Sequence, residues 1–186
     1  MSSFSSFLRL WEWFSSVDTD RSGQITATEL QRALINGDWT PFDLDTVKML
    51  LNIFDTDRSG SIGFNEFAGL WKYIKDWQNV FRAVDRDGSG SIDSRELANA
   101  LKGFGYDLTN NPYLIDLIQR KYGGHLLSQY GAPPGITFDR FVRACVVVKQ
   151  LSEAFTHFPK ANPYGGPTGP ATISYEQFME TVLRLP

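Results

Sequence analysis

The sequence contains one cysteine, Cys145, among its 186 residues. A single cysteine cannot form a disulfide framework within the chain, and a free thiol is typical of a reducing compartment. We therefore expect a cytoplasmic protein whose fold is held together by its core. With 42% apolar and 14% aromatic residues, the sequence can fill such a core.

Histidine is almost as scarce, since His125 and His157 are the only two. A nucleophile and base pair with Cys145 has no local motif to support it, and Cys145 lies on the apolar side of an expected helix, where core packing explains it. These three residues also lack the spacing of a zinc site. We expect a protein that is not an enzyme.

Long hydrophobic runs are absent. The apolar residues near the N-terminus are interrupted by Arg9 and Glu12, and the run Val146 to Val148 is far too short to cross a bilayer. We expect neither a signal peptide nor a membrane-spanning helix, so any membrane contact would be peripheral. Basic residues are scattered rather than clustered, and this gives no footprint for nucleic acid.

The stretch Asp85–Glu96 has the pattern of a twelve-residue calcium-binding loop. Calcium takes six to eight oxygen ligands at about 2.3 to 2.6 Å, and an ordinary helix–helix turn would not need an oxygen at every ligand position. Gly90, at position 6, permits the positive φ that wraps the backbone around an ion. The ligands expected here are Asp85, Asp87, Ser89, Ser91 through its carbonyl, Asp93 and Glu96.

Two earlier stretches repeat this pattern, and in the second of them Gly63 at position 9 leaves one ligand to water. The loop at Asp85 has four acids against three in each of the others, so we expect it to bind most tightly, in the range of roughly 10⁻⁷ to 10⁻⁵ M. Whether Mg²⁺ occupies the second loop at rest stays open. The expected ligands are Asp18, Asp20, Ser22, Gln24 and Glu29 in the first loop, and Asp55, Asp57, Ser59, Ser61 and Glu66 in the second.

These three loops hold ten of the 21 acidic residues. Three bound Ca²⁺ ions would change the formal net charge from −3 to +3. This reversal favours acidic partners or anionic lipid once calcium is bound. We therefore expect peripheral, calcium-dependent membrane association.

Apolar residues at helical spacing surround the loops and predict an all-α fold of about eight helices. The pattern Phe64–Val84 has no breaker, which predicts one long helix that leaves the second loop and enters the third, and Asn36-Gly37 is expected to end the helix after the first loop. Two further helix–loop–helix units follow. Arg140 replaces the closing glutamate of the fourth, and the fifth loop, residues 159–172, has no acid, so we expect neither to bind metal.

Loops of this kind pair through a short strand around position 8, which predicts the pairs Ile25 with Ile62 and Ile92 with Ile136. The equivalent residue of the fifth unit, Ile173, has no intramolecular mate. Because an unpaired strand edge with apolar neighbours tends to bind another molecule, we expect a two-fold dimer formed by the fifth units. The residues expected in that interface are Ile173, Tyr175 and Phe178.

The three loop starts lie 37 and 30 residues apart, and several short stretches accompany them. Together they resemble the penta-EF-hand family, in particular its peflin-like group. The resemblance covers the whole chain and implies one domain, 1–186, with EF-hands at about 5–36, 43–76, 72–105, 112–148 and 138–186. The stretches that carry it are Gly37–Phe42, Trp71–Phe81, Gly103–Tyr106 and Ser174–Phe178.

The resemblance also implies an activity. Family members dimerise through their fifth hands, as homodimers or heterodimers, and bind proline-rich segments of partners in membrane traffic or related signalling when calcium is present. The same resemblance implies recruitment to membranes or the nucleus with calcium. The alternative for the aromatic residues of Phe64–Val84 is that they pack in the core and bind no ligand. The cleft residues at matching positions are Trp71, Trp77, Phe104 and Tyr106.

Two other functions stay open. A calcium buffer would bind the ions with little opening and no partner. A regulatory subunit of a calpain-like protease would pair its fifth hand with a catalytic chain.

Overall fold

The structure, a computed structural model, describes residues 2–123, 135–158 and 171–183. Within these residues the fold is all-α, as predicted, and extended segments occur only as isolated bridges. The eight helices are α1 (Ser2–Val17), α2 (Ala27–Ala33), α3 (Leu44–Phe54), α4 (Phe64–Val84), α5 (Ser94–Gly103), α6 (Pro112–Tyr122), α7 (Phe138–Thr156) and α8 (Tyr175–Leu183).

Each of the first three loops also starts the helix that follows it. Thr26 and Glu29 form a reciprocal capping box at the start of α2, and Asp93 and Glu96 form another at α5. At α4 the glycine at position 9 has no side chain, so only the return contact is made, from the Gly63 N–H to Glu66 at 2.9 Å. The loop residues therefore determine where these helices begin.

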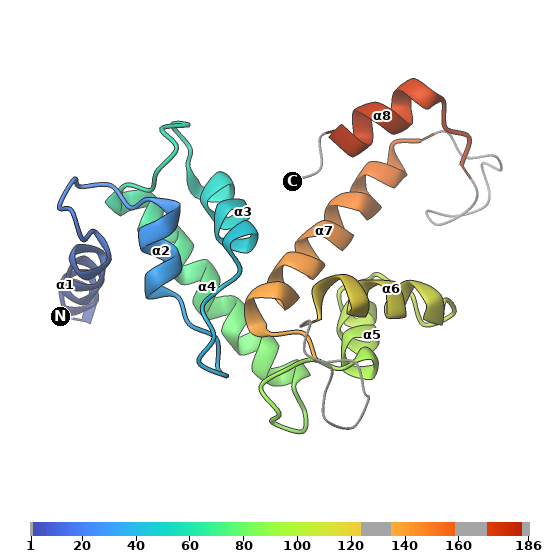
Figure 1. Ribbon diagram of the computed structural model, residues 1–186, viewed down its shortest axis with the longest axis horizontal. Coiled ribbons are helices and arrows are strands. Elements are labelled where there is room, and N and C mark those ends of the chain that lie inside the picture. Colours follow the sequence, from blue (N-terminus) through green and yellow to red (C-terminus); the bar gives the residue numbers. More distant parts are fainter. Residues whose placement is uncertain (1, 124–134, 159–170, 184–186) are drawn as a thin grey trace.

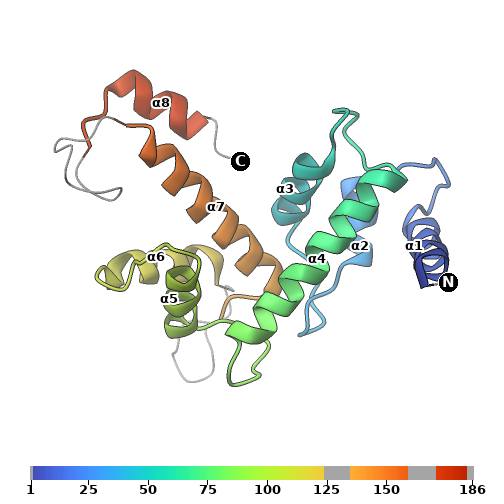
Figure 2. The same ribbon diagram turned by 180° about the vertical axis from the view of Figure 1, so that it is seen from behind.

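The long helix α4 lies at the centre of the molecule, with α1, α2 and α3 on one side and α5, α6 and α7 on the other (Figures 1 and 2). It is a single helix of 21 residues, as predicted. It contains no proline, and its one glycine, Gly69, does not break it. Phe67, Leu70, Ile74 and Phe81 are its buried residues. The helix connects the second loop rigidly to the third.

The predicted loop pairs are confirmed. Ile25 and Ile62 exchange two backbone hydrogen bonds of 2.8 and 2.9 Å, and Ile92 and Ile136 exchange two of 2.9 Å. All four isoleucine side chains are fully buried, so each bridge also contributes to the core.

The helix after the first loop ends earlier than predicted. It stops at Ala33, and Leu34 is already extended, because Ile35 forms a bridge with Pro41. Asn36 then lies in the turn of this small hairpin and accepts a hydrogen bond from the Asp139 N–H at 3.2 Å.

The last helices extend away from the rest. Helix α7 leaves the centre beside α5 and α6 and carries α8 at its far end (Figures 1 and 2). The fourth and fifth loops fall largely outside the described residues, as does His125. No helix in the described ranges combines the length and apolarity needed to cross a membrane.

Candidate calcium centres and partner groove

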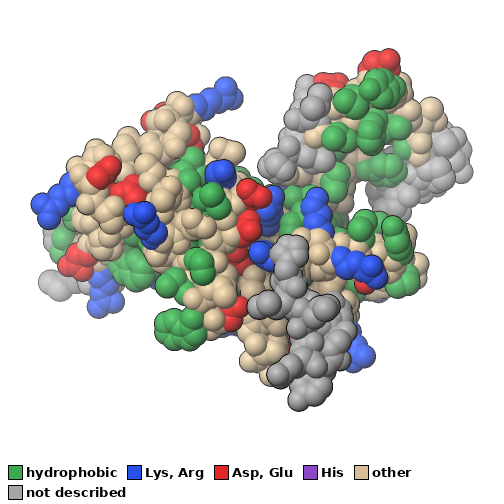
Figure 3. All heavy atoms as spheres, viewed as in Figure 1, with side chains coloured by type: hydrophobic (Ala, Val, Ile, Leu, Met, Phe, Trp, Pro, Cys, Tyr) green, Lys and Arg blue, Asp and Glu red, His purple; other side chains and the backbone are tan. Residues whose placement is uncertain are grey.

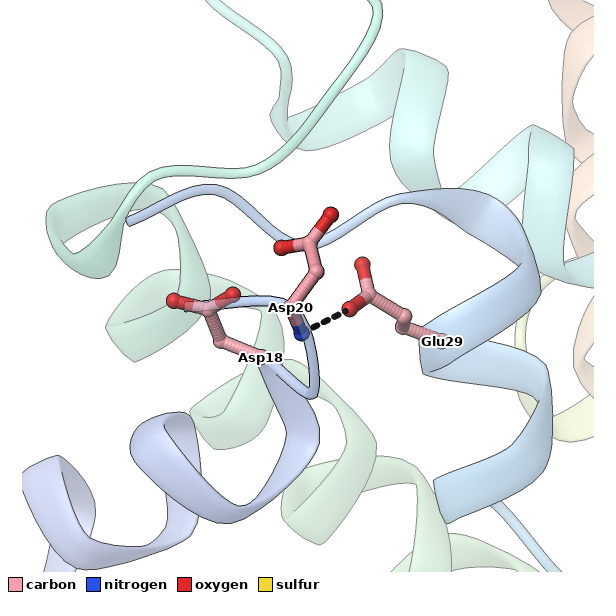
Figure 4. A group of neighbouring side chains, drawn as sticks. All are labelled: Asp18, Asp20 and Glu29. Carbon is pink, nitrogen blue, oxygen red and sulfur yellow. Dashed lines mark hydrogen bonds between the residues drawn. The ribbon is translucent and has the colours of Figure 1, made fainter. Parts of the chain in front are cut away.

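Three clusters of carboxylates form where the sequence predicts calcium loops. In each cluster one oxygen from every residue lies within 4.8 Å of the others. In the first loop, Asp18 and Asp20 come from the segment after α1, and Glu29 comes from the first turn of α2 (Figure 4). The clusters are Asp18, Asp20 and Glu29; Asp55, Asp57 and Glu66; and Asp85, Asp87 and Glu96.

Backbone N–H groups hold the carboxylate of position 1 in the same way in all three loops. In the first loop, the Ser22 N–H donates to Asp18 Oδ1 at 3.0 Å and the Gly23 N–H donates to Asp18 Oδ2 at 2.8 Å. This turn requires a positive φ at position 6, and Gly23, Gly60 and Gly90 have φ of 79°, 82° and 78°.

Two further ligand oxygens lie next to each other in every loop. The hydroxyl at position 5 donates to the carbonyl at position 7, over 2.9 Å for Ser22 with Gln24 and 3.1 Å for Ser59 with Ser61. The third loop has the same contact between Ser89 Oγ and the carbonyl of residue 91, at 2.9 Å. Each loop therefore gathers carboxylate, hydroxyl and carbonyl oxygens, the hard donor set that suits Ca²⁺.

The closing glutamates are held through both oxygens. Glu29 Oε1 accepts from the Thr19 N–H at 2.9 Å, and its Oε2 accepts from the Thr26 N–H at 3.0 Å. Hydrogen bonds from the Thr26 backbone, then from its hydroxyl and from Thr19, lower the pKa of Glu29 from 4.5 to about 2 despite its burial. The Gly63 N–H and then Thr56 lower the pKa of Glu66 in the same way. These carboxylates therefore stay ionised, as metal ligands must be.

Asp93 differs from the other expected ligands of the third loop. Its Oδ1 accepts from the N–H groups of Arg95 and Glu96, both at 2.8 Å, and thereby caps α5. Its carboxylate lies outside the cluster of Asp85, Asp87 and Glu96. A role for Asp93 as a ligand, direct or through water, stays a prediction.

In the fourth hand, a positively charged residue stands at position 12, where the first three loops have a glutamate. Arg140 Nη1 donates to the Gly123 carbonyl at 3.2 Å, and Nη2 lies 3.6 Å from Asp43 Oδ2. A guanidinium here supplies the positive charge that an ion would bring and repels a cation. That the fourth hand is structural and binds no metal stays a prediction.

Three of the four residues predicted for a partner cleft line one groove. Trp77 on α4 and Phe104 at the end of α5 are in edge-to-face contact, with ring centroids 6.1 Å apart, and Tyr106 lies on the same wall. The groove has a volume of about 570 Å³. Its opposite wall, which the sequence analysis missed, includes Cys145 and Gln150 of α7. The spacing of residues 145, 146, 149, 150 and 153 along one helix face was the available signal.

Trp71 lies elsewhere. Its ring is 4.6 Å from that of Trp13, so it belongs to the contact between α1 and α4, and it does not line the groove. Trp77 comes six positions later, and six positions turn a side chain by about 240° around an α-helix, so the two rings lie on different faces of α4. The residues predicted for dimerisation are all exposed on α8 or just before it, Ile173 at 41%, Tyr175 at 72% and Phe178 at 49%. Hydrophobic side chains gather over α8 (Figure 3).

Paired helix–loop–helix units with these oxygen clusters define an EF-hand calcium-binding protein. The family model of an EF-hand domain pair matches residues 8–72, and that of an EF-hand domain matches residues 76–105. Sorcin of Schistosoma japonicum is 43% identical over 166 residues, 89% of each chain. The structure of a homolog of programmed cell death 6 protein from Leishmania major Friedlin is 31% identical, with a TM-score of 0.71 over 94% of this chain and 92% of that one.

The chain belongs to the penta-EF-hand family, and it binds calcium. Peflin of Xenopus laevis is 38% identical over 169 residues, which are 91% of this chain and 56% of that protein. The chain therefore spans just over half the length of that relative.

Proposed function

We propose that this protein is a calcium sensor and adaptor that binds Ca²⁺ through its first three loops and then presents the groove of Trp77, Phe104 and Tyr106 to proline-rich segments of partner proteins. One observation carries the proposal. Trp77 of α4 and Phe104, which directly follows α5, both line the groove, and the third loop connects these two helices.

The third loop controls the angle between these helices. Helix α4 ends at Val84 with Asp85, the first ligand, as its C-cap, and α5 begins at Ser94, two residues before Glu96, the last ligand. An ion held by residues at both ends of the loop fixes the direction in which α5 leaves α4. The separation of Trp77 and Phe104 then depends on whether that ion is bound.

The groove suits an extended, proline-rich ligand. Its wall presents aromatic rings on which pyrrolidine rings can pack, and a polyproline II segment loses little conformational entropy on binding because it is already extended. Lys149, Gln150 and Glu153 supply polar groups along the opposite rim. Burial raises the pKa of the Cys145 thiol to about 12, so this thiol stays protonated and is a poor nucleophile.

We infer a homodimer or heterodimer formed by the fifth hands, supported by the exposed apolar residues of α8. We also infer a cytoplasmic protein that reaches membranes with calcium and acts in membrane traffic or related signalling. Neither nucleic acid nor a catalytic reaction has a role in this function.

The test is binding of a synthetic proline-rich peptide to the purified chain by calorimetry, with calcium and with chelator. We expect micromolar binding only with calcium, lost in Trp77→Ala and retained in Trp71→Ala, which removes an aromatic ring of the same helix outside the groove. Binding that is independent of calcium, or lost equally in both variants, would contradict the proposal. Calcium binding without any peptide binding would favour a buffer.

A further inference from the structure

A side-chain hydrogen bond joins the first and second loops beside their backbone bridge. Ser61 Oγ donates to Gln24 Oε1 at 3.0 Å. Both residues occupy position 7, where the expected ligand is the main-chain carbonyl, so neither side chain is needed to hold an ion.

Both ends of this contact reach a serine at position 5. Ser59 Oγ lies 3.3 Å from Ser61 Oγ, and Ser22 Oγ donates to the Gln24 carbonyl at 2.9 Å. A hydroxyl has one hydrogen, and Ser61 gives it to the amide oxygen of Gln24, which can only accept. Ser59 Oγ gives its own hydrogen to the Ser61 carbonyl at 3.1 Å, so Ser61 connects the side chain of Ser59 to that of Gln24.

The pair formed by the third and fourth loops cannot make this contact. The residue that corresponds to Gln24 is Gly135, which has no side chain. A Cβ at Gly135 would lie 2.2 Å from Ser91 Oγ, so the two loops approach too closely for a longer side chain. The first two loops are thus joined by this side-chain hydrogen bond as well as by their backbone bridge, whereas Gly135 can make no such bond with Ser91, and Ser91 provides an internal control.

We propose that Gln24 is a positioning residue that couples the first and second calcium sites, so that occupancy of either raises the affinity of the other. The inference rests on the proposed function, in which both loops bind calcium. The chain of hydrogen bonds ties Ser59, an expected ligand of the second loop, to the residue whose carbonyl is an expected ligand of the first. Ordering one loop therefore reduces the conformational entropy that the other has still to lose.

The coupling is measured in the full chain with the third loop silenced by Glu96→Gln. Calorimetric titration with Ca²⁺ gives the product of the two remaining binding constants. Glu29→Gln or Glu66→Gln, added singly, leaves one loop and gives each constant alone. The ratio of the joint product to the product of the single constants is the coupling factor. We expect a factor of about three to ten with Gln24 in place, the size of one net hydrogen bond, and a factor near one after Gln24→Leu.

Ser91→Ala is the matched control and should leave the coupling factor of the first two sites unchanged. An equal factor with and without Gln24→Leu would overturn the inference while leaving the proposed function intact. A parent protein whose first two loops take up no calcium would overturn both. A second readout needs no metal, because the melting temperatures of Gln24→Leu, Ser61→Ala and the double variant should be non-additive in chelator, whereas additive shifts would count against the hydrogen bond.

Discussion

At the scale of single residues, the closing glutamates decide whether each loop is a calcium site. Glu96 is 8% exposed, and its Oε1 and Oε2 accept from the N–H groups of Arg86 and Asp93 at 2.8 and 3.1 Å. The residue therefore joins the two ends of the loop even before an ion arrives. Its carboxylate is the one ligand that can close a calcium shell with two oxygens.

Glu96→Gln should remove one calcium ion from the stoichiometry, because an amide offers one uncharged oxygen in place of two charged ones. The measurement is calorimetric titration of the variant beside the parent protein. Asp93→Asn is the companion variant, and because Asp93 mainly caps α5, it should retain the stoichiometry. Unchanged stoichiometry in Glu96→Gln would contradict the assignment of the third loop.

The low pKa of Glu29, about 2 against an ordinary 4.5, also predicts a dependence of stability on pH. A carboxylate whose pKa is lower in the folded than in the unfolded protein stabilises the fold at any pH above its unfolded-state pKa. This stabilisation is lost as the pH falls from about 4.5 towards 2. In chelator, the free energy of unfolding should therefore fall over this range less steeply in Glu29→Gln than in the parent. Parallel curves from urea titrations at several pH values would show that the hydrogen bonds of Thr26 and Thr19 do not have this effect.

At the scale of the elements, the start of α7 attaches the fourth hand to the segment between α2 and α3. Asp139 is 1% exposed and accepts hydrogen bonds from the Asp43 N–H and Thr137 Oγ1, both at 2.6 Å. Arg143 lies 3.2 Å from Asp43 Oδ1. Two halves of the molecule that are remote in sequence are therefore joined by a buried polar contact.

Asp139→Ala should destabilise the calcium-free protein by about 2 to 3 kcal/mol, because it removes a charged acceptor and leaves its donors without a partner. Thermal unfolding followed by circular dichroism measures the effect, with a fall in Tm of roughly 5 to 10 °C. The control is Asp76→Ala, which removes an exposed partner of Lys72 and should change the stability by less than about 0.5 kcal/mol. A similar Tm for both variants would contradict the importance of this contact.

The elements also show how far the sequence can be interpreted alone. The calcium loops and the pairing of Ile25 with Ile62 follow from local chemistry, because each residue of a twelve-residue pattern has its own reason to be present. The end of α2 and the position of Trp71 do not. The first depends on the bridge of Ile35 with Pro41, and the second depends on Trp13, a neighbour from another helix. The spacing of apolar residues predicts on which face of a helix a residue lies, but not which other element packs against that face.

At the scale of the whole molecule, the predicted dimer accounts for the exposed residues of α8. Tyr175→Asp or Phe178→Asp should lower the dimer population strongly, since each would bury a charge in an apolar interface. Light scattering after size-exclusion chromatography gives the mass. The control is Tyr113→Asp, because Tyr113 on α6 is 70% exposed and Tyr175 is 72% exposed, so only their positions differ. Equal masses for the α6 and α8 variants would contradict assembly through the fifth hand.

The central claim is that an ion in the third loop controls the groove lined by Trp77, Phe104 and Tyr106. The most direct measurement is a calcium titration that records calorimetric heat and tryptophan emission together, on the parent protein, Trp77→Phe and Glu96→Gln. We expect two or three bound ions in the parent protein and a red shift of its emission that disappears in both variants, because the reporter is lost in one and the controlling ion in the other. Two outcomes would contradict this claim. In one, calcium binds with the same heat and the emission change persists in Trp77→Phe; in the other, calcium binds with the same heat and the emission of the parent protein does not change.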